Sequence, residues 1–208
     1  MKRMNILMLL LLFPFYALLA TNGSQLGAGY GKEWVVTEKS QLTISGSSNV
    51  NEFQCMSLSY AGGNSLYETW DVISKRPVMS GLITLKASAF DCQNKIMTQD
   101  MQKTIKADKY PNVKVHFLSL ERMPSSGHQQ KAKGVVEICL AGVSRQYEIS
   151  ATFQELGKSK AMLAGSLEFN LTDFNIEPPT KMMGAIKVKD CFTIDFNLEL
   201  KSYDTTLQ

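Results

Sequence analysis

The chain of 208 residues has few of the side chains that catalytic and metal-binding sites use. It contains two histidines: we place His116 on the outward face of a strand and His128 in a polar loop, neither beside a nucleophile. H-E-x-x-H, C-x-x-C and glycine-rich phosphate motifs are absent from the sequence. The residues therefore give no support for a metal site or a Ser/His/Asp hydrolase, and we expect no enzyme and no metal or cofactor.

A basic surface is also lacking. The chain has 22 lysines and arginines against 19 acidic residues, and two of the basic residues, Lys2 and Arg3, lie in a segment that we expect to be removed. No basic stripe interleaved with aromatic residues occurs, which argues against a nucleic-acid partner.

Only the N-terminus carries a long hydrophobic run. Residues 1–20 combine a positive start, an apolar run over residues 6–19 and a small residue at Ala20, which predicts a secretory signal. The alternative is a transmembrane anchor, but the run is short for a span of about 20 residues. We expect cleavage after Ala20, or as late as Gly23, a flexible lead-in over residues 21–33 and one domain over residues 34–208. Because no cysteine lies near the cleavage site, we predict no lipid anchor and a periplasmic or extracellular protein.

Four cysteines would enter that oxidising compartment, and two disulfides are expected. Cys139 and Cys191 both fall on the polar faces of their strands. Taking these strands as neighbours, we predict the pairs Cys139–Cys191 and Cys55–Cys92. The alternatives are four free thiols or a metal site, although no C-x-x-C spacing exists.

The last part of the chain alternates apolar and polar residues from Ile186 to Leu200. This pattern predicts a strand with one apolar face that bends or is interrupted near Asp190. Similar shorter runs cover residues 34–38, 41–45, 50–60, 81–89, 113–117, 135–140, 146–153 and 162–170. Together they predict an all-β fold, an antiparallel lipocalin-like barrel of about eight strands.

Helical periodicity occurs only between Asn94 and Lys109, where apolar residues recur on one face. We predict one short amphipathic helix there, ended by Tyr110 and Pro111. Asp91 and Asp100 would cap this helix or favour its positive N-terminal end.

The apolar faces define the barrel interior, which is either a core packed with its own side chains or a cavity for a slender apolar ligand. The helix and the loop with Pro178 and Pro179 are expected at the rim. The residues that we predict to line the interior are Leu42, Ile44, Phe53, Ile83, Leu85, Val115, Phe117, Ile138, Leu140, Tyr147, Ile149, Phe153, Leu167, Phe169, Phe174, Met182, Met183, Ile186, Val188, Phe192, Ile194 and Phe196.

Four segments carry a resemblance to a known family: G-S-S-N-V-N-E-F at 46–53, K-Y-P-N-V-K-V-H-F at 109–117, G-V-V-E-I-C-L-A-G-V-S-R at 134–145 and L-T-D-F-N-I-E-P-P-T at 171–180. In this order and spacing they resemble the YceI-like family of secreted, lipocalin-shaped barrels. The resemblance implies that the interior holds a long isoprenoid, a polyprenyl chain or a quinone tail, for storage or transport. The alternative is a secreted structural or interaction barrel with a filled core and no ligand. Exposed barrel faces would also allow a homodimer.

Overall fold

A computed structural model describes residues 31–57 and 61–203 of the chain. The predicted signal sequence and residues 21–30 of the lead-in lie outside this part. The described elements are β1 (Lys32–Val36), β2 (Gln41–Ser47), β3 (Glu52–Ser57), β4 (Ser65–Asp71), β5 (Arg76–Lys86), η1 (Ala87–Ala89), β6 (Phe90–Asp91), α1 (Lys95–Thr104), β7 (Asn112–Arg122), β8 (Gln129–Leu140), β9 (Val143–Gly157), β10 (Lys160–Asn170), η2 (Leu171–Phe174), β11 (Thr180–Lys181), η3 (Met182–Gly184), β12 (Ile186–Lys187) and β13 (Cys191–Ser202).

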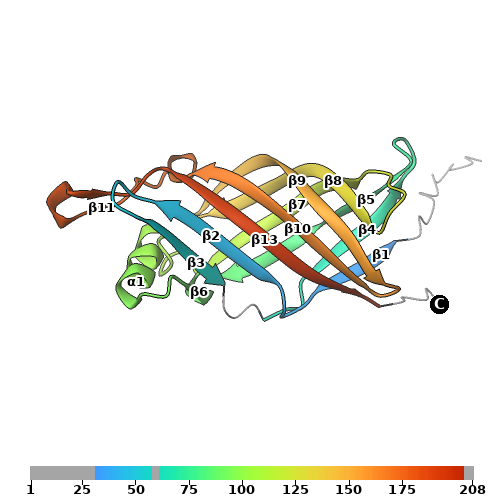
Figure 1. The fold of residues 1–208 in the computed structure, drawn as a ribbon, viewed down its shortest axis with the longest axis horizontal. Coiled ribbons are helices and arrows are strands. Elements are labelled where there is room, and N and C mark those ends of the chain that lie inside the picture. The colour runs from blue at the N-terminus through green and yellow to red at the C-terminus, as the bar shows by residue number, and fades with distance from the viewer. Residues whose placement is uncertain (1–30, 58–60, 204–208) are drawn as a thin grey trace, which may run out of the picture.

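Eight antiparallel strands close into a barrel, as predicted. The order is β1, β4, β5, β7, β8, β9, β10 and β13, and β13 pairs back to β1, which completes the cylinder. β2 pairs with the earlier part of β13, so β1 and β2 share one edge, and β3 and β6 extend the wall beside α1. In Figure 1 the barrel lies on its side, with α1 and β11 at one end and the C-terminus at the other.

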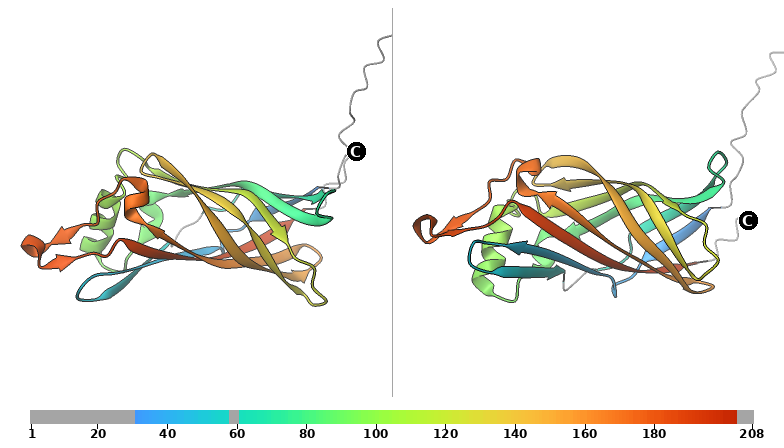
Figure 2. Two further views of the ribbon diagram at one scale, coloured as in Figure 1. Left: turned by 90° about the horizontal axis from the view of Figure 1, so that it is seen from above. Right: turned by 45° about the horizontal axis from the view of Figure 1, so that its top comes forward.

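The predicted final strand is interrupted where expected. β12 ends at Lys187, and β13 resumes at Cys191 and runs to Ser202. Its inward residues alternate as the sequence indicates, because successive side chains of a strand point to opposite faces. β11, η3 and β12 form a small hairpin that projects from the end of the barrel (Figure 2).

The sequence pattern missed β4. Of its inward-facing positions, Leu66 is apolar and fully buried, whereas Glu68 is charged. Glu68 lies 3.0 Å from Arg122, a buried residue of β7. Arg122 also stacks over the Phe153 ring at 4.3 Å and lies 3.3 Å from Glu155. Because the charged Glu68 interrupts the alternation of apolar and polar residues, the sequence of β4 does not show the pattern of a strand with one apolar face.

The barrel is filled at the end that holds Arg122. Trp34 packs edge-on against Phe153 at 5.6 Å, and both are almost completely buried. Leu163 and Leu200 close this end with no measurable exposure. We call this part of the barrel the closed end.

Acid titration should reveal the buried carboxyl at the closed end. Burial raises the pKa of Glu68, and the Arg122 guanidinium opposes this shift only in part. The folded chain therefore holds this proton at a pH where the unfolded chain has already lost it. Glu68 contributes stability at pH values below its ordinary pKa, and this contribution is lost as pH rises through the raised pKa.

The test is the variant Glu68→Gln, which cannot titrate. Between acidic and neutral pH, the unfolding free energy of the wild type should fall relative to that of E68Q. Urea titrations at several pH values measure both curves. Parallel curves would show that Glu68 has the same pKa in both states.

The helix is shorter than predicted because of how it ends. Asn94 caps α1 by accepting hydrogen bonds from Ile96 N and Met97 N, so the prediction that Asp91 or Asp100 caps this helix is wrong. At the other end Lys106 is left-handed (φ 56°), Lys106 N donates to Lys103 O, and Ala107 N donates to Gln102 O. This is a Schellman motif, in which glycine usually occupies the left-handed position. With lysine there, the sequence carried no stop signal before Pro111.

The cysteine prediction is confirmed for one pair and wrong for the other. Cys55 of β3 forms a disulfide with Cys92, but Cys139 and Cys191 are free thiols. The thiols cannot meet because Cys139 is on β8 and Cys191 on β13, and β9 and β10 lie between these strands. Parity placed both side chains correctly on the outside, but it could not show which strands are neighbours.

Candidate functional site

The half of the barrel nearest α1 is hollow. An outer chamber of about 400 Å³ opens at this end, and a smaller inner chamber of about 50 Å³ continues toward the closed end. The two chambers are adjacent, because they share the wall residues Leu42, Leu85, Val115, Ile138 and Ile194, and we refer to them together as the lumen. The outer volume is within the range of about 300–1,000 Å³ typical of small-molecule sites.

Exposure of the inward side chains shows the same division. Leu163 and Leu167 lie on the same face of β10, yet Leu163 is fully buried and Leu167 is only half-buried. Leu200 and Ile194 of β13 differ in the same way. The interior is thus a packed core at the closed end and an apolar lumen at the other.

Most of the predicted lining residues surround this lumen. They are Leu42, Ile44, Phe53, Ile83, Leu85, Val115, Phe117, Ile138, Leu140, Ile149, Leu167, Phe169, Ile186, Val188, Phe192, Ile194 and Phe196. They come from β2, β3, β5, β7, β8, β9, β10, β12 and β13 and from Val188, which directly follows β12, so segments distant in sequence build one wall.

Five predicted residues lie elsewhere. Phe153 belongs to the core of the closed end. Phe174 of η2 is fully buried, and its ring centroid lies 5.8 Å from that of Phe169. Tyr147 donates a hydrogen bond of 2.9 Å to Asp173, and burial together with this carboxylate raises the pKa of Tyr147. Met182 and Met183 point into solvent at the tip of the β11–β12 hairpin.

Several residues of the lumen wall were not predicted, although the alternation of apolar and polar residues in the sequence indicates them. Val113, Val136 and Leu198 share strand faces with predicted residues, so the same alternation would have included them. Met97, Met101 and Ile105 of the α1 region close the outer chamber from the side. Their helical spacing was recognised, but only the folded chain shows that this face covers a cavity.

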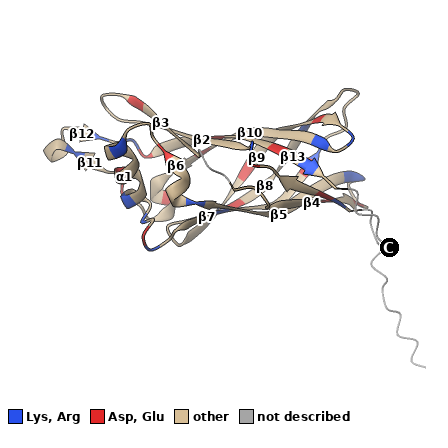
Figure 3. Cartoon of the chain, turned by 90° about the horizontal axis from the view of Figure 1, so that it is seen from below, with Lys and Arg blue, Asp and Glu red and all other residues tan. Residues whose placement is uncertain are grey.

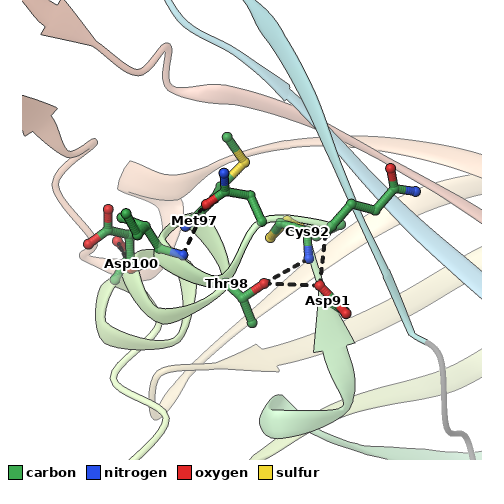
Figure 4. Close-up of a disulfide and its surroundings, with 10 residues drawn as sticks. Asp91, Cys92, Met97, Thr98 and Asp100 are labelled. Carbon is green, nitrogen blue, oxygen red and sulfur yellow. Dashed lines mark hydrogen bonds between the residues drawn. A yellow bond between two sulfur atoms is a disulfide. The ribbon is translucent and has the colours of Figure 1, made fainter.

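The contacts of α1 hold it against the side of the outer chamber. Cys92 is bonded to Cys55 of the barrel wall, and the Cys92 N–H donates to Thr98 Oγ1 at 3.0 Å. Thr98 in turn donates to Asp91 at 3.1 Å (Figure 4). Asp100 of α1 forms an ion pair of 2.7 Å with Lys181 of β11.

The polar wall residues of the outer chamber already have partners within the protein. The Ser48 hydroxyl donates to Asn51 Oδ1 at 2.8 Å, and Asn94 caps α1. Thr104 donates to the Asp100 carbonyl at 2.8 Å. This wall offers a ligand apolar area and shape rather than a set of free hydrogen-bonding groups.

The sequence matches the YceI-like domain over residues 35–200. The chain belongs to the YceI-like family. The match spans the barrel from β1 into β13, including α1 and the lumen. No curated protein matches the chain in sequence.

Two solved structures show the fold of this YceI-like chain at low sequence identity. BcnA of Burkholderia cenocepacia is 16% identical with a TM-score of 0.60, covering 79% of this chain and 98% of BcnA. A polyisoprenoid-binding domain from Saccharophagus degradans, implicated in plant cell wall breakdown, is 11% identical with a TM-score of 0.61 and covers 82% and 98% of the two chains. These similarities establish the barrel architecture.

Gly46 keeps the outer chamber of this YceI-like barrel open. A Cβ atom at this position would lie 2.4 Å from Phe192 Cε1 and 2.8 Å from Phe53 Cζ, so the two rings lie against the wall only because residue 46 has no side chain. The rings pack edge-on at 6.0 Å. Replacing Gly46 with alanine should push Phe192 into the chamber.

We expect G46A to fold, because its close contacts are with side chains, and to bind a prenyl ligand roughly tenfold more weakly by loss of buried apolar area. Titration with octaprenol measures this effect. The control is Gly127→Ala in the β7–β8 loop, where the atom nearest to the added Cβ is Ser125 Oγ at 3.9 Å. Equal affinity of G46A and wild type would show that Phe192 does not border the bound chain.

Proposed function

We propose that this protein binds a long isoprenoid, a polyprenyl chain or the tail of a quinone, in the barrel lumen and stores or transports it. The observation that carries the proposal is the apolar lumen, open at the α1 end and filled at the other. Its wall consists mainly of aliphatic and aromatic side chains. A ligand with one long apolar part and a polar head fits a lumen that opens at the α1 end.

The binding energy would come from removing apolar surface from water, roughly 25 cal/mol per Å². An isoprenoid tail has no hydrogen-bonding groups to satisfy, and in the outer chamber Ser48, Asn94 and Thr104 are already hydrogen-bonded within the protein. Membership of the YceI-like family and the likeness to the polyisoprenoid-binding domain of Saccharophagus degradans support this ligand class.

We propose binding rather than catalysis. Asp100 and Lys181 are the ionisable side chains on the outer wall, and they form an ion pair with each other. Among the described residues no cluster of three or more histidine, cysteine or acidic side chains is placed to hold a metal ion.

The disulfide and the family also support a location outside the reducing cytoplasm, and we propose the periplasm or the extracellular space. Within the described ranges, no helix has the length and apolar character needed to cross a bilayer. Homodimer formation stays a prediction, which native mass spectrometry would test.

The decisive experiment has two parts. Protein purified from its native envelope is extracted with organic solvent, and the extract should contain a prenyl lipid. Purified protein stripped of lipid is then titrated with farnesol, geranylgeraniol and octaprenol. Affinity should rise with chain length until the lumen is full, because each added unit buries more apolar area. A lipid-free extract together with affinities that ignore chain length would overturn the proposal.

A further inference from the structure

The tip of the β11–β12 hairpin carries two methionines in an unusual environment. The exposed fractions of Met182 and Met183 are 74% and 108%, and both residues are left-handed, with φ of 50° and 55°. Large apolar side chains are costly in water, and a left-handed backbone is costly for residues other than glycine, asparagine and aspartate. An isolated turn in water would favour asparagine or glycine at both positions.

The hairpin is held in place rather than loosely attached. The Asn49 side chain donates to Ala185 O at 2.9 Å and accepts from Lys187 N at 2.8 Å. Lys181 pairs with Asp100 of α1, as described above. These contacts anchor the hairpin to the β2–β3 turn and to α1, and the hairpin projects beyond the end of the barrel (Figures 1 and 2).

Other apolar tips surround the same opening. Val50 in the β2–β3 turn is 62% exposed, and Ile96 in the first turn of α1 is 72% exposed. Asn51, next to Val50, and Ile96 itself also line the outer chamber. The apolar patch is therefore continuous with the lumen.

The charge of the hairpin is positive. Residues 179–189 contain Lys181, Lys187 and Lys189 and no acidic residue, and Glu177 and Asp190 flank them in sequence. α1 adds Lys95 and Lys103, while its one acid, Asp100, is paired with Lys181. Figure 3 shows basic positions on β11, β12 and α1 at one end of the molecule. The exposed Glu52, which follows Asn51 at the start of β3, is an acidic residue of the same rim. Apolar tips among lysines are suited to the surface of an anionic bilayer.

We propose that the α1 end docks on an anionic lipid bilayer, with Met182 and Met183 entering the boundary between headgroups and acyl chains and the lysines contacting the headgroups. The lumen opening would then face the membrane, and an apolar tail would pass between bilayer and lumen without crossing water. This inference rests on the proposed function for its purpose, but docking can be measured without any lumen ligand.

The test is the double variant Met182→Asn, Met183→Asn. Asparagine tolerates the left-handed backbone, so the melting temperature should stay equal or rise. Binding to vesicles of equal parts phosphatidylglycerol and phosphatidylcholine, measured by co-sedimentation, should weaken at least tenfold. Lys187→Gln and Lys189→Gln should each weaken it about fivefold. Wild-type binding should also fall with added salt and on pure phosphatidylcholine.

The control is the double variant Val72→Asn, Ile73→Asn at the β4–β5 turn of the closed end, where the exposed fractions are 80% and 89%. It removes similar apolar area from the opposite end and should bind vesicles like the wild type. The proposal is overturned if the wild type does not bind vesicles or if the control variant loses vesicle binding. It is also overturned if the methionine variant still binds vesicles like the wild type but no longer forms dimers. Octaprenol titration of the same proteins without vesicles tests the lumen separately: vesicle binding without octaprenol binding would refute the proposed function and leave docking intact.

Discussion

Replacing Ile194 with glutamate should abolish isoprenoid binding and leave a folded barrel. Ile194 lies on β13 where the two chambers meet, and it is half-buried because it borders open space. In the empty lumen water can hydrate the carboxylate. A bound tail would displace that water and leave a charge in an apolar site, which costs several kcal/mol. At about 1.4 kcal/mol for each tenfold change, affinity should fall by about a hundredfold or more.

Octaprenol titration and native mass spectrometry measure this loss. The matched control is Asn197→Glu, which places the same charge on the exposed face of the same strand. Circular dichroism should be the same for both variants. Retained affinity in I194E would place the bound chain outside the junction, and equal loss in N197E would show a nonspecific effect of charge.

Removing the Cys55–Cys92 disulfide should produce the largest loss of stability. The bridge spans a sequence separation of 37 residues, and closing a loop of this size stabilises a fold by roughly 3–4 kcal/mol. The double variant C55A/C92A should therefore melt roughly 10 °C lower. Because Cys55 lines the outer chamber and Cys92 precedes α1, the variant should also bind octaprenol more weakly.

The free thiols provide the control for this experiment. The variant C139S/C191S also loses two cysteines, but these residues form no bond in the structure. Its melting temperature should match that of the wild type within about 2 °C, since single surface changes usually cost under about 0.5 kcal/mol. Calorimetry with and without reductant measures both variants. A similar loss in the two variants would show that Cys139 and Cys191 are bonded in solution.

The strands with apolar inward faces could be predicted from sequence because alternation is a local property. β13 shows this well: Phe192, Ile194 and Phe196 face inward as predicted, and its break from β12 lies at the expected place. β4 could not be predicted in the same way, because Glu68 faces inward and its partner Arg122 is on another strand. A pattern read along one segment does not contain that partner.

The sequence by itself determined which faces of the strands are apolar, which side chains point outward, and the family to which the chain belongs. Only the tertiary structure decided which strands are neighbours, and hence that Cys55 meets Cys92 while Cys139 and Cys191 stay apart. It also decided that the apolar faces meet around Trp34 and Phe153 but separate around Ile194. The reason is that apolarity belongs to each residue, whereas a cavity depends on the distance between walls, which the closure of the whole barrel sets.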